Sequence, residues 1–460
     1  MSENRAIKRV AIFGGGITAW SAAAALKRRI PSIEVTVVSS PPTADALADR
    51  LVNTLPSISD FHADIGLSPE DTIVRARNGL RIGTNFKGWA EGSPDYVHAY
   101  GTYGVSVGGV AFHQFWLRDH RGHGRSFDSF APVATEAGYG LRLSVETYQQ
   151  LMRDYSMHLG ARERRGDAAG TKLRDSDDFV EAVVLADGAQ VTADLFIDCT
   201  GPQAMVRSQL GKDFEDWTRW LLCDRIAVRT EAAEASPDPL DDVIATTAGW
   251  NWRSSSPSAT EIGKVYCSAH GGDHEGAIRL RQGRLTEPWQ RNCVAIGDAA
   301  VAVEPLEWTN LHLAHSQIDR LVAMMPDAGF APVELAEYNR QCNAEADRVR
   351  DFLCMHYLTA RRPEPFWKDA AAVDPSPSLA HTLSLFAERG RLPYYEEETF
   401  ARDSWLAVLI GQGYLPRRID PLSDSVEPEE AERALSSRHP HVAEVQASYR
   451  GTFLQMGQNA

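Results

Sequence analysis

The chain of 460 residues contains 43% apolar and 24% charged residues, which is typical of a large globular enzyme and excludes a disordered or fibrous chain. Its formal net charge of −15 disfavours nucleic acids and anionic membranes as partners, because both require clustered lysine and arginine side chains. No apolar run reaches the roughly 18 residues that span a bilayer, and residues 1–8 do not resemble a signal peptide. We therefore expect a cytoplasmic protein.

The cysteines are scattered along the chain without the paired spacing of a disulfide framework or a zinc site. Buried thiols in a reducing compartment explain this distribution better, and we predict no metal site. The six cysteines are Cys199, Cys223, Cys267, Cys293, Cys342 and Cys354.

The amino-terminal segment predicts a strand, a helix and a second strand. The apolar run "RVAIF" at residues 9–13 is followed by a glycine turn, the alanine-rich "SAAAALKRR" and the β-branched "IEVTVVSS" at residues 33–40. Alanine favours helix, and β-branched residues favour strands. The segment therefore predicts a βαβ unit with two parallel strands.

The turn in this unit has the pattern G-x-G-x-x-A, in which Gly14 permits a tight turn and Gly16 lets a pyrophosphate approach the backbone. Small Ala19 allows close packing of the helix on the strand, and the phosphates would lie at the positive end of the helix. We predict that Gly14, Gly16, Thr18 and Ala19 bind a dinucleotide. The alternative is a tight strand-to-helix turn that binds no ligand.

The second strand ends in Ser39 and Ser40, where dinucleotide-binding folds usually carry an acidic residue for the ribose 2′-hydroxyl. A neutral hydroxyl binds a ribose hydroxyl less strongly than a carboxylate does. We therefore count Ser39 among the cofactor-binding residues and expect a weakened cofactor affinity.

The middle of the chain is less regular. Residues 45–150 suggest bent strands and loops, notably in the glycine-rich "GTYGVSVGGVAF" at residues 101–112. Residues 143–159 have helical spacing, and a turn at residues 186–188 joins a predicted strand pair. A core strand returns after residue 292, and long helical patterns follow to the carboxyl terminus.

Two later strand ends identify the dinucleotide. The strand "ADLFIDCTG" ends in Asp198 and Gly201, and "CVAIGDAA" contains Gly297 and Asp298. Flavoproteins of the aromatic-hydroxylase type close their FAD domain with a D-x-x-G strand end and with a later G-D-A motif. We therefore predict FAD as the cofactor, with these four residues at its site. The alternative is that the glycine turn and these two strand ends are unrelated to one another and bind no common ligand.

A specific resemblance follows from the segment after the G-D-A motif. "VEPLEWTNLHLAHSQIDRLVAMMP" at residues 303–326 is similar to the E-P-L-E-S-T-G segment and following helix of the flavin-dependent tryptophan halogenase family. The resemblance extends from Val10 to about Pro421. Its further matches are "GWNWRSSSP", "VHAYG", "YNRQCNAEADRVRDFLCMHY", "PEPFWKDA" and "SWLAVLIGQGYLP".

The resemblance implies a reaction and its parts. In this family, reduced FAD and oxygen convert chloride to hypochlorous acid, which travels through a tunnel to an aromatic substrate. A lysine ammonium holds the oxidised halogen, and a glutamate helps to take up the ring proton. Because the chain shows no nicotinamide motif, a separate flavin reductase is the implied source of FADH2.

The family lysine has no counterpart by our alignment. We place it in a string K-x-G-E-x-T-x-P, of which Thr54 and Pro56 are retained. Asp49 then stands in the lysine position, while Leu51 and Val52 replace the glycine and the glutamate. Because a carboxylate repels an electron-rich oxidant that an ammonium would hold, this alignment argues against halogenation.

The family glutamate is retained as Glu307, our candidate catalytic proton acceptor. The Ser-Thr-Gly that follows it in the family reads Trp308, Thr309 and Asn310 here, and we expect this change to crowd a halide site built from that backbone. We count these three residues among the substrate-binding ones. In the alternative interpretation, Glu307 only stabilises the amino end of a helix.

Two further matches concern the aromatic substrate. His98 and Tyr100 in "VHAYG" correspond to the family's substrate-lining segment, although packing of a loop is an equal alternative. Trp250 and Trp252 retain the family's W-x-W signature but lose the Ile-Pro that follows. Because alternate strand positions share one face, these two indoles are better explained as core packing.

We predict an α/β fold with a Rossmann-like three-layer FAD-binding domain of the aromatic-hydroxylase type, an antiparallel substrate sheet and a helical carboxyl-terminal part. The expected FAD domain covers residues 1–330 discontinuously, with the substrate sheet inserted at about 60–190 and 215–290. The helical region at 331–460 is expected to cover the substrate pocket.

Since several halogenation devices are altered, the main expected function is a two-component FAD-dependent monooxygenase that hydroxylates an indole, tryptophan or other electron-rich aromatic. One alternative is a halogenase that uses FADH2, oxygen and chloride or bromide. The other is a non-catalytic or flavin-poor relative that binds an aromatic ligand or a partner enzyme. The resemblance points to natural product biosynthesis and is compatible with a homodimer.

Overall fold

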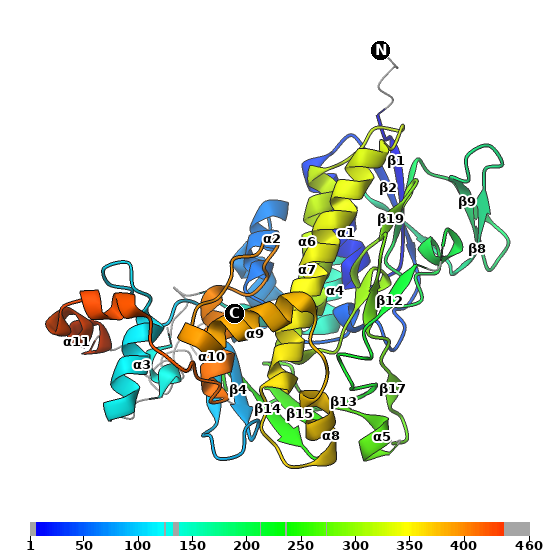
Figure 1. The fold of residues 1–460 in the computed structure, drawn as a ribbon. Coiled ribbons are helices and arrows are strands. Elements are labelled where there is room, and N and C mark those ends of the chain that lie inside the picture. Colours follow the sequence, from blue (N-terminus) through cyan, green and yellow to red (C-terminus); the bar gives the residue numbers. More distant parts are fainter. Residues whose placement is uncertain are drawn as a thin grey trace. The chain divides into compact units, whose positions relative to one another are not determined.

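The computed structural model describes residues 6–123, 126–131, 138–211, 213–234, 237–272 and 274–436. The chain divides into two compact units, each built from three segments that are far apart in the sequence (Figure 1). The first unit consists of Met1–Asn78, Leu143–Thr218 and Ile278–Asp347, and the second of Gly79–Arg142, Arg219–Ala277 and Arg348–Ala460.

A six-stranded sheet forms the centre of the first unit, in the order β19-β20-β11-β1-β2-β7. All neighbours are parallel except β19 and β20. Parallel strands are usually covered on both faces, which explains the apolar runs in β1 and β11. The strands are β1 (Arg9–Phe13), β2 (Glu34–Ser39), β7 (Arg162–Arg165), β11 (Leu195–Asp198), β19 (Trp289–Gln290) and β20 (Cys293–Ala295).

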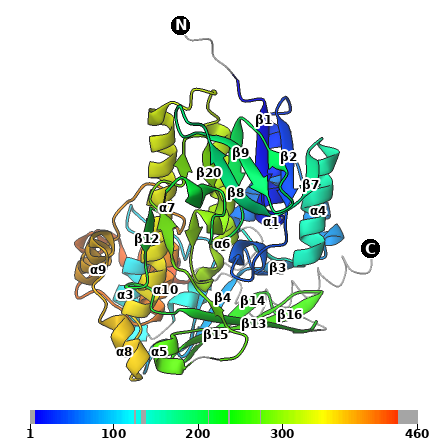
Figure 2. The same cartoon turned by 90° about the vertical axis from the view of Figure 1, so that its right-hand side faces the viewer.

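Helices cover one face of this sheet and a small antiparallel sheet covers the other (Figures 1 and 2). On the helical face, α1 (Ile17–Arg29) contacts α4 (Val145–His158) and α6 (Asn310–Ala323), which its buried alanines allow at close range. On the other face, Val183 and Leu185 of β9 pack against the central strands. That small sheet comprises β8 (Ala168–Leu173), β9 (Val180–Leu185) and β10 (Gln190–Val191).

The remaining elements of the first unit lie in its connections. They include α2 (Ser57–Ile65), a π-helical turn at Glu70–Arg75 and a small sheet of β12 (Phe214–Asp216), β18 (Gly283–Leu285) and β21 (Val301–Ala302). The long helix α7 (Pro332–Leu358) begins in this unit.

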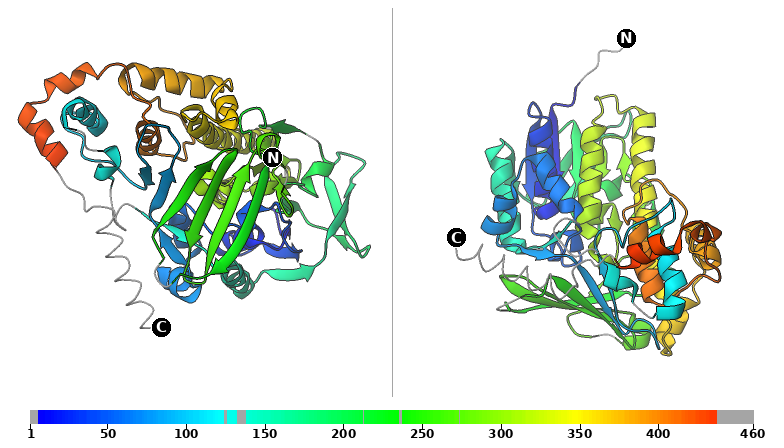
Figure 3. Two further views of the ribbon diagram at one scale, coloured as in Figure 1. Left: turned by 90° about the horizontal axis from the view of Figure 1, so that it is seen from below. Right: turned by 90° about the vertical axis from the view of Figure 1, so that its left-hand side faces the viewer.

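The second unit contains a sheet with neighbouring strands in the order β13-β16-β15-β14-β4-β5 (Figure 3, left). Its neighbours are antiparallel except β14 and β4. The strands are β4 (Gly83–Lys87), β5 (Tyr96–Ala99), β13 (Arg225–Ala232), β14 (Leu240–Thr246), β15 (Gly249–Ser255) and β16 (Ala259–Tyr266), with a separate pair β3 (Gly79–Arg81) and β6 (Gly140–Arg142).

The helices of the second unit include most of the carboxyl-terminal part of the chain. They are α3 (Phe112–His123), α5 (Ser268–Gly271), α8 (Pro365–Ala371), α9 (Pro377–Arg389), α10 (Arg402–Gly411) and α11 (Pro428–Ser436). Proline at the first helical position begins α8, α9 and α11, as its fixed φ favours.

The fold class expected from the sequence is confirmed: the parallel sheet, the layers around it and the helical carboxyl-terminal part are all present. The turn at residues 186–188 joins β9 to β10, with Gly188 at φ 83°. Helices α2 and α3 were not expected within residues 45–150, because short helices between glycine-rich stretches leave little periodicity. The expected domain boundaries stay a prediction.

Within the residues that the structure describes, no helix combines the length and apolarity needed to cross a membrane. Nor do three or more histidine, cysteine or acidic side chains in this part of the chain converge as a metal site would require. All six cysteines are buried thiols that form no disulfide.

Candidate functional site

The glycine turn of the first unit follows β1 and leads into α1. Gly14 has φ 124°, and a Cβ atom there would lie 2.5 Å from the carbonyl oxygen of Cys199. A Cβ atom on Gly16 would lie 2.1 Å from the carboxyl carbon of Asp49. Ala19 is fully buried under the turn. Each small residue is therefore required by a close approach, as the sequence pattern predicts.

The carboxylate of Asp49 lies at the amino end of α1, where the phosphates of a dinucleotide are expected. Its Oδ1 accepts a hydrogen bond of 2.7 Å from the backbone N–H of Thr18, and its side chain is only 4% exposed. Burial raises the pKa of Asp49 to about 6, against the lowering effect of the hydrogen bonds from Thr18. An anion of the chain itself thus fills the expected phosphate position.

This position corrects an expectation from the sequence. The alignment with the family lysine puts Asp49 where an oxidised halogen would be held, whereas the structure puts its carboxylate against the glycine turn. The short helix η1 (Leu47–Asp49) contacts α1, α6 and the turn of Asp298, which explains why Asp49 is buried there. The argument from charge reversal against halogenation therefore does not hold.

A second buried carboxylate adjoins the first. Asp298 lies in the turn η6 (Gly297–Ala299) after β20, and its Oδ2 accepts a 2.7 Å hydrogen bond from the backbone N–H of Ala48. Burial raises its pKa well above the usual range. Gly297 has φ 68° and donates its N–H to Gln317 Oε1 at 2.7 Å. The structure thus brings the first and third FAD motifs together.

Asp198, at the end of β11, has a different environment. Its two oxygens accept hydrogen bonds from the hydroxyl and backbone N–H of Thr200 and from the backbone N–H groups of Val206 and Arg207, at 2.6 to 3.0 Å. These bonds organise the segment after the strand. Gly201, at φ 83°, approaches the 43–46 segment, where a Cβ atom would lie 2.9 Å from Thr43 Oγ1. Their flavin-binding roles stay predictions.

The glycine turn, the amino end of α1 and the turn of Asp298 lie together around the Asp49 carboxylate, and an FAD whose pyrophosphate replaced this carboxylate would meet the N–H donors of α1 there. Ser39, at the end of β2, donates its hydroxyl to Glu163 Oε1 at 2.8 Å. Ser39, the residue at the expected ribose position, therefore has the carboxylate of Glu163 beside it, on strand β7.

The segment of Glu307 is a strained turn before α6. Glu307 and Trp308 have φ 63° and 61°, a left-handed region that non-glycine residues seldom adopt and that is common at functional sites. Both side chains are buried. Asn310 Nδ2 donates to the carbonyl oxygen of Val303 at 2.9 Å, which anchors the start of α6. The backbone of this turn and the burial of Glu307 therefore restrict the conformations that its side chain can adopt.

Two buried polar atoms of this turn, Thr309 Oγ1 and Asn310 Oδ1, have no hydrogen-bond partner among the described residues. Buried polar groups are nearly always satisfied, so such atoms mark a place that a ligand or water would complete. They lie at the amino end of α6, in the segment where the resemblance implies a halide site.

In the second unit, His98 lies in an aromatic cluster that the sequence pattern does not indicate. Its ring centroid lies 6.0 Å from that of Phe352 and 6.4 Å from that of Phe400, and these two rings stack at 3.8 Å. Trp405 contacts Phe352 edge-on at 5.1 Å. Their positions in the sequence are far from His98, so no local signal could have found them.

Next to this cluster is a hollow of about 310 Å³, lined by aromatic residues that include Tyr395, Phe400 and Trp405. Glu398 also lines it, and burial raises the pKa of this carboxyl to about 7. The hollow can thus accept an aromatic ring and place a titratable group beside it.

Tyr100 lies beside a buried ionic cluster in the second unit. The guanidinium carbon of Arg81 lies 5.3 Å from the centroid of the Tyr100 ring. Arg81 pairs with Asp241, which also binds Arg142 at 2.8 Å and accepts a 2.6 Å hydrogen bond from Ser254. Two fully buried guanidinium groups thus share one carboxylate, and the sequence analysis did not identify them.

Trp250 and Trp252 are buried in the second unit, with centroids 5.6 Å apart. Their indole N–H groups donate to Tyr357 Oη at 2.9 Å and to Glu261 Oε1 at 3.0 Å. Satisfied, buried indoles agree with the core-packing interpretation.

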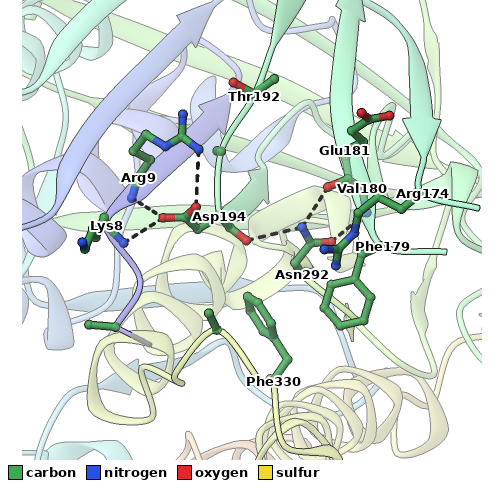
Figure 4. Close-up of a pocket in the computed structure, with 13 residues that line it drawn as sticks. Lys8, Arg9, Arg174, Phe179, Val180, Glu181, Thr192, Asp194, Asn292 and Phe330 are labelled. Atoms are coloured by element: carbon green, nitrogen blue, oxygen red, sulfur yellow. Dashed lines mark hydrogen bonds and ion pairs between the residues drawn. The ribbon is translucent and has the colours of Figure 1, made fainter. Parts of the chain in front are cut away.

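A hollow of about 820 Å³ lies elsewhere in the first unit, at the amino ends of the parallel strands (Figure 4). Its lining includes Asp194, just before β11, which accepts hydrogen bonds of 2.9 Å from the backbone N–H groups of Lys8 and Arg9. Ligands of such sheets bind beyond the carboxyl ends of the strands. We therefore assign this hollow no part in the flavin site.

Comparisons with known proteins agree on one family. The model of the tryptophan halogenase family matches residues 9–428. Among curated proteins, the tryptophan 7-halogenase RebH of Lentzea aerocolonigenes is 25% identical, over 90% of this chain and 91% of its own. Among solved structures, the flavin-dependent halogenase BrvH of Brevundimonas sp. BAL3 is 31% identical with a TM-score of 0.86, covering 98% of this chain and 97% of its own. Xcc4156, a flavin-dependent halogenase of Xanthomonas campestris, has the same TM-score at 29% identity.

Proposed function

Because the chain belongs to the tryptophan halogenase family, we propose that it is a flavin-dependent halogenase acting on an indole or another electron-rich aromatic substrate. The observation that carries this proposal is the match to BrvH, a flavin-dependent halogenase, at 31% identity over nearly the whole chain. The comparisons favour halogenation over the hydroxylation that the sequence suggested as the main function. The argument for hydroxylation from the charge of Asp49 also carries less weight, because this carboxylate lies at the glycine turn.

FAD, delivered as FADH2 by a separate reductase, would supply the electrons with which oxygen turns a halide into an electrophilic halogen. Gly14, Gly16 and the first N–H groups of α1 would hold its pyrophosphate, and the motif of Asp298 would hold the adjoining part. Thr309 Oγ1 is suited to donate a hydrogen bond to the halide, because it is buried without a partner among the described residues.

Glu307 would accept the proton that the aromatic ring releases when the halogen is added. Its strained, buried turn restricts the carboxylate to few orientations, which suits a general base. His98, Phe352 and Phe400 would contact the aromatic substrate in the second unit. Tryptophan itself is one candidate substrate, since several curated relatives, RebH among them, are tryptophan halogenases.

We place the cation that steers the oxidised halogen at Arg81. Arg81, Arg142 and Asp241 are fully buried, so the field of these charged groups is poorly screened. Arg81 also donates to Thr84 Oγ1, and Thr84 is the β4 partner of His98 in β5. The cation thus adjoins the strand that carries the proposed substrate contacts.

The test is to supply the purified chain with FAD, a flavin reductase, NADH, oxygen, bromide or chloride and a panel of indoles and phenols. Products are followed by mass spectrometry for both halogen and oxygen addition. We expect halogenated product that depends on halide. Oxygenated product that is indifferent to halide would instead establish the hydroxylase, and failure of the chain to bind FAD or FADH2 would support the non-catalytic alternative.

Variants then test the assigned residues. Glu307→Gln should lower kcat for halogenation roughly 10²- to 10⁴-fold with FAD affinity unchanged, as expected for loss of a general base. The exposed Glu337→Gln is the matched control.

Arg81→Lys should retain measurable halogenation, whereas Arg81→Met should lose it roughly 10²- to 10³-fold. Full activity of a folded Arg81→Met variant would exclude the assignment of Arg81.

A further inference from the structure

The carboxylate missing from the end of β2 is present on the neighbouring strand. β2 and β7 are parallel, and Val37 of β2 lies opposite Glu163 of β7. Side chains alternate between the two faces of a strand, so Ser39, two residues after Val37, projects from the same face as Glu163. Glu163 therefore lies beside the place where dinucleotide-binding folds carry the ribose-binding acid.

Two hydrogen-bonding partners orient this carboxylate. Ser39 donates its hydroxyl to Oε1 at 2.8 Å, and Arg153 of α4 donates Nε and an Nη group to Oε2 at 3.1 and 2.5 Å. The Glu163 side chain is 15% exposed. The hydrogen bond from Arg153 lowers its pKa, with a smaller contribution from Ser39, so Glu163 is ionised near neutral pH.

The same helix also contacts the glycine turn. Gln149, one helical turn before Arg153, donates its side-chain amide to the carbonyl oxygen of Gly15 at 2.7 Å. Helix α4 thus links the phosphate-binding turn to the Glu163 carboxylate. A ligand whose phosphates lie on the turn would extend its adjoining sugar toward this strand end.

We infer that Glu163 binds the ribose 2′-hydroxyl of the adenosine half of FAD, in place of the acidic residue that β2 lacks. This inference rests on the proposed flavin dependence. Each carboxylate oxygen can accept two hydrogen bonds, and Oε1 receives one from Ser39, so it can also accept one from a ribose hydroxyl. Ser39 and Arg153 would act as positioning residues that hold Glu163 in this orientation.

The first experiment measures dissociation constants of FAD, FMN, ADP and 2′-deoxy-ADP for the full chain by calorimetry. Glu163→Gln should weaken FAD and ADP about 10- to 100-fold, because it removes charge-assisted hydrogen bonds. The same variant should leave 2′-deoxy-ADP within about threefold of the unmodified chain, and FMN, which lacks adenosine, unaffected. Glu181→Gln, an exposed glutamate paired with Lys172, is the matched control and should change none of these constants.

The second experiment returns the carboxylate to its usual strand. The double variant Glu163→Gln, Ser39→Asp should recover most of the lost FAD affinity, which a merely structural role of Glu163 would not allow. Equal weakening of ADP and 2′-deoxy-ADP, or unchanged FAD affinity in folded Glu163→Gln, would overturn the inference. Failure of the unmodified chain to bind any flavin would instead contradict the proposed function.

Discussion

The carboxylate of Asp49 occupies the position at which we expect a cofactor phosphate. Asp49 accepts a hydrogen bond from Thr18 at the amino end of α1 and lies against Gly16, where pyrophosphate is expected. A carboxylate and a phosphate compete for the same N–H donors and repel each other. We therefore expect FAD binding to require movement of the η1 segment, and we expect Asp49 to lower the affinity for FAD.

Removal of this competitor should tighten FAD binding. We expect Asp49→Ala to lower the FAD dissociation constant about tenfold, while at pH 4 the cofactor-free protein loses about 1 kcal/mol of stability with the hydrogen bond to the helix end. Fluorescence titration and urea denaturation measure the two effects. Asp187→Asn, in the exposed β9–β10 turn, is the control and should alter neither. Weaker FAD binding by Asp49→Ala would show that the carboxylate supports the cofactor.

The raised pKa of Asp49 also predicts a pH dependence. Burial raises the pKa of Asp49 to about 6 in the folded chain, above the ordinary value of 3.8, so the ionised form is disfavoured there. The contribution of Asp49 to stability is therefore present below about pH 4 and is lost as the pH rises through 6.

Relative to Asp49→Asn, the unmodified cofactor-free protein should lose roughly 2–3 kcal/mol between pH 4 and pH 7. The measurement is urea denaturation of both proteins across this range. The comparison cancels most of the contribution of neighbouring Asp298, which is present in both. A difference that stays constant with pH would show that Asp49 is not the titrating group.

At the scale of elements, two turns of the first unit are stabilised in different ways. Asp198 organises one of them by accepting four hydrogen bonds from residues 200–207. Glu307 and Trp308 form another, with left-handed backbone that glycine would adopt at lower cost. One turn is stabilised by hydrogen bonds, whereas the other is held against strain by its buried surroundings.

Asp198→Asn should destabilise the protein by about 2–3 kcal/mol, because an amide NH2 cannot accept from the N–H groups that the lost oxygen bound. Asp187→Asn makes the same chemical change where the carboxylate accepts one exposed hydrogen bond from Ala189, and should cost less than about 1 kcal/mol. Chemical denaturation compares the two. Equal effects would mean that the four bonds of Asp198 add little.

At the scale of the whole molecule, the two units carry different parts of the proposed reaction. The first unit contains the three FAD motifs and Glu307, and the second contains the aromatic cluster around His98 and the buried pair of arginines. Each unit combines three separated chain segments, so neither is a continuous module of the sequence.

Bound FAD should stabilise the protein by mass action. At a free concentration of 100 times its dissociation constant, we expect the free energy of unfolding to rise by about 2.7 kcal/mol. Hydrogen exchange should show the strongest protection at the start of α1, in η1 and in the turn of Asp298. Protection confined to the second unit would contradict the assignment of the flavin to the first.

The local features of this fold were predictable from the sequence. The apolar run of β1, the glycine turn and the alanines of α1 are adjacent, and each acts through the conformational preference of its own residues. The family resemblance was equally accessible, because the segment around Glu307 is contiguous. From these features alone, the sequence predicts the βαβ unit, FAD as the cofactor and the family resemblance.

The arrangement of charges was decided only by the tertiary structure. Asp49 meets the turn of Gly16 across more than 30 residues, and Glu163 reaches Ser39 only because β7 pairs beside β2. Arg81 meets Asp241 through a separation of 160 residues. Sequence patterns report periodicity and local conformation, whereas an ionic contact depends on which remote segments pack together. Both the misplacement of Asp49 and the missed contact of Glu163 with Ser39 follow from that difference.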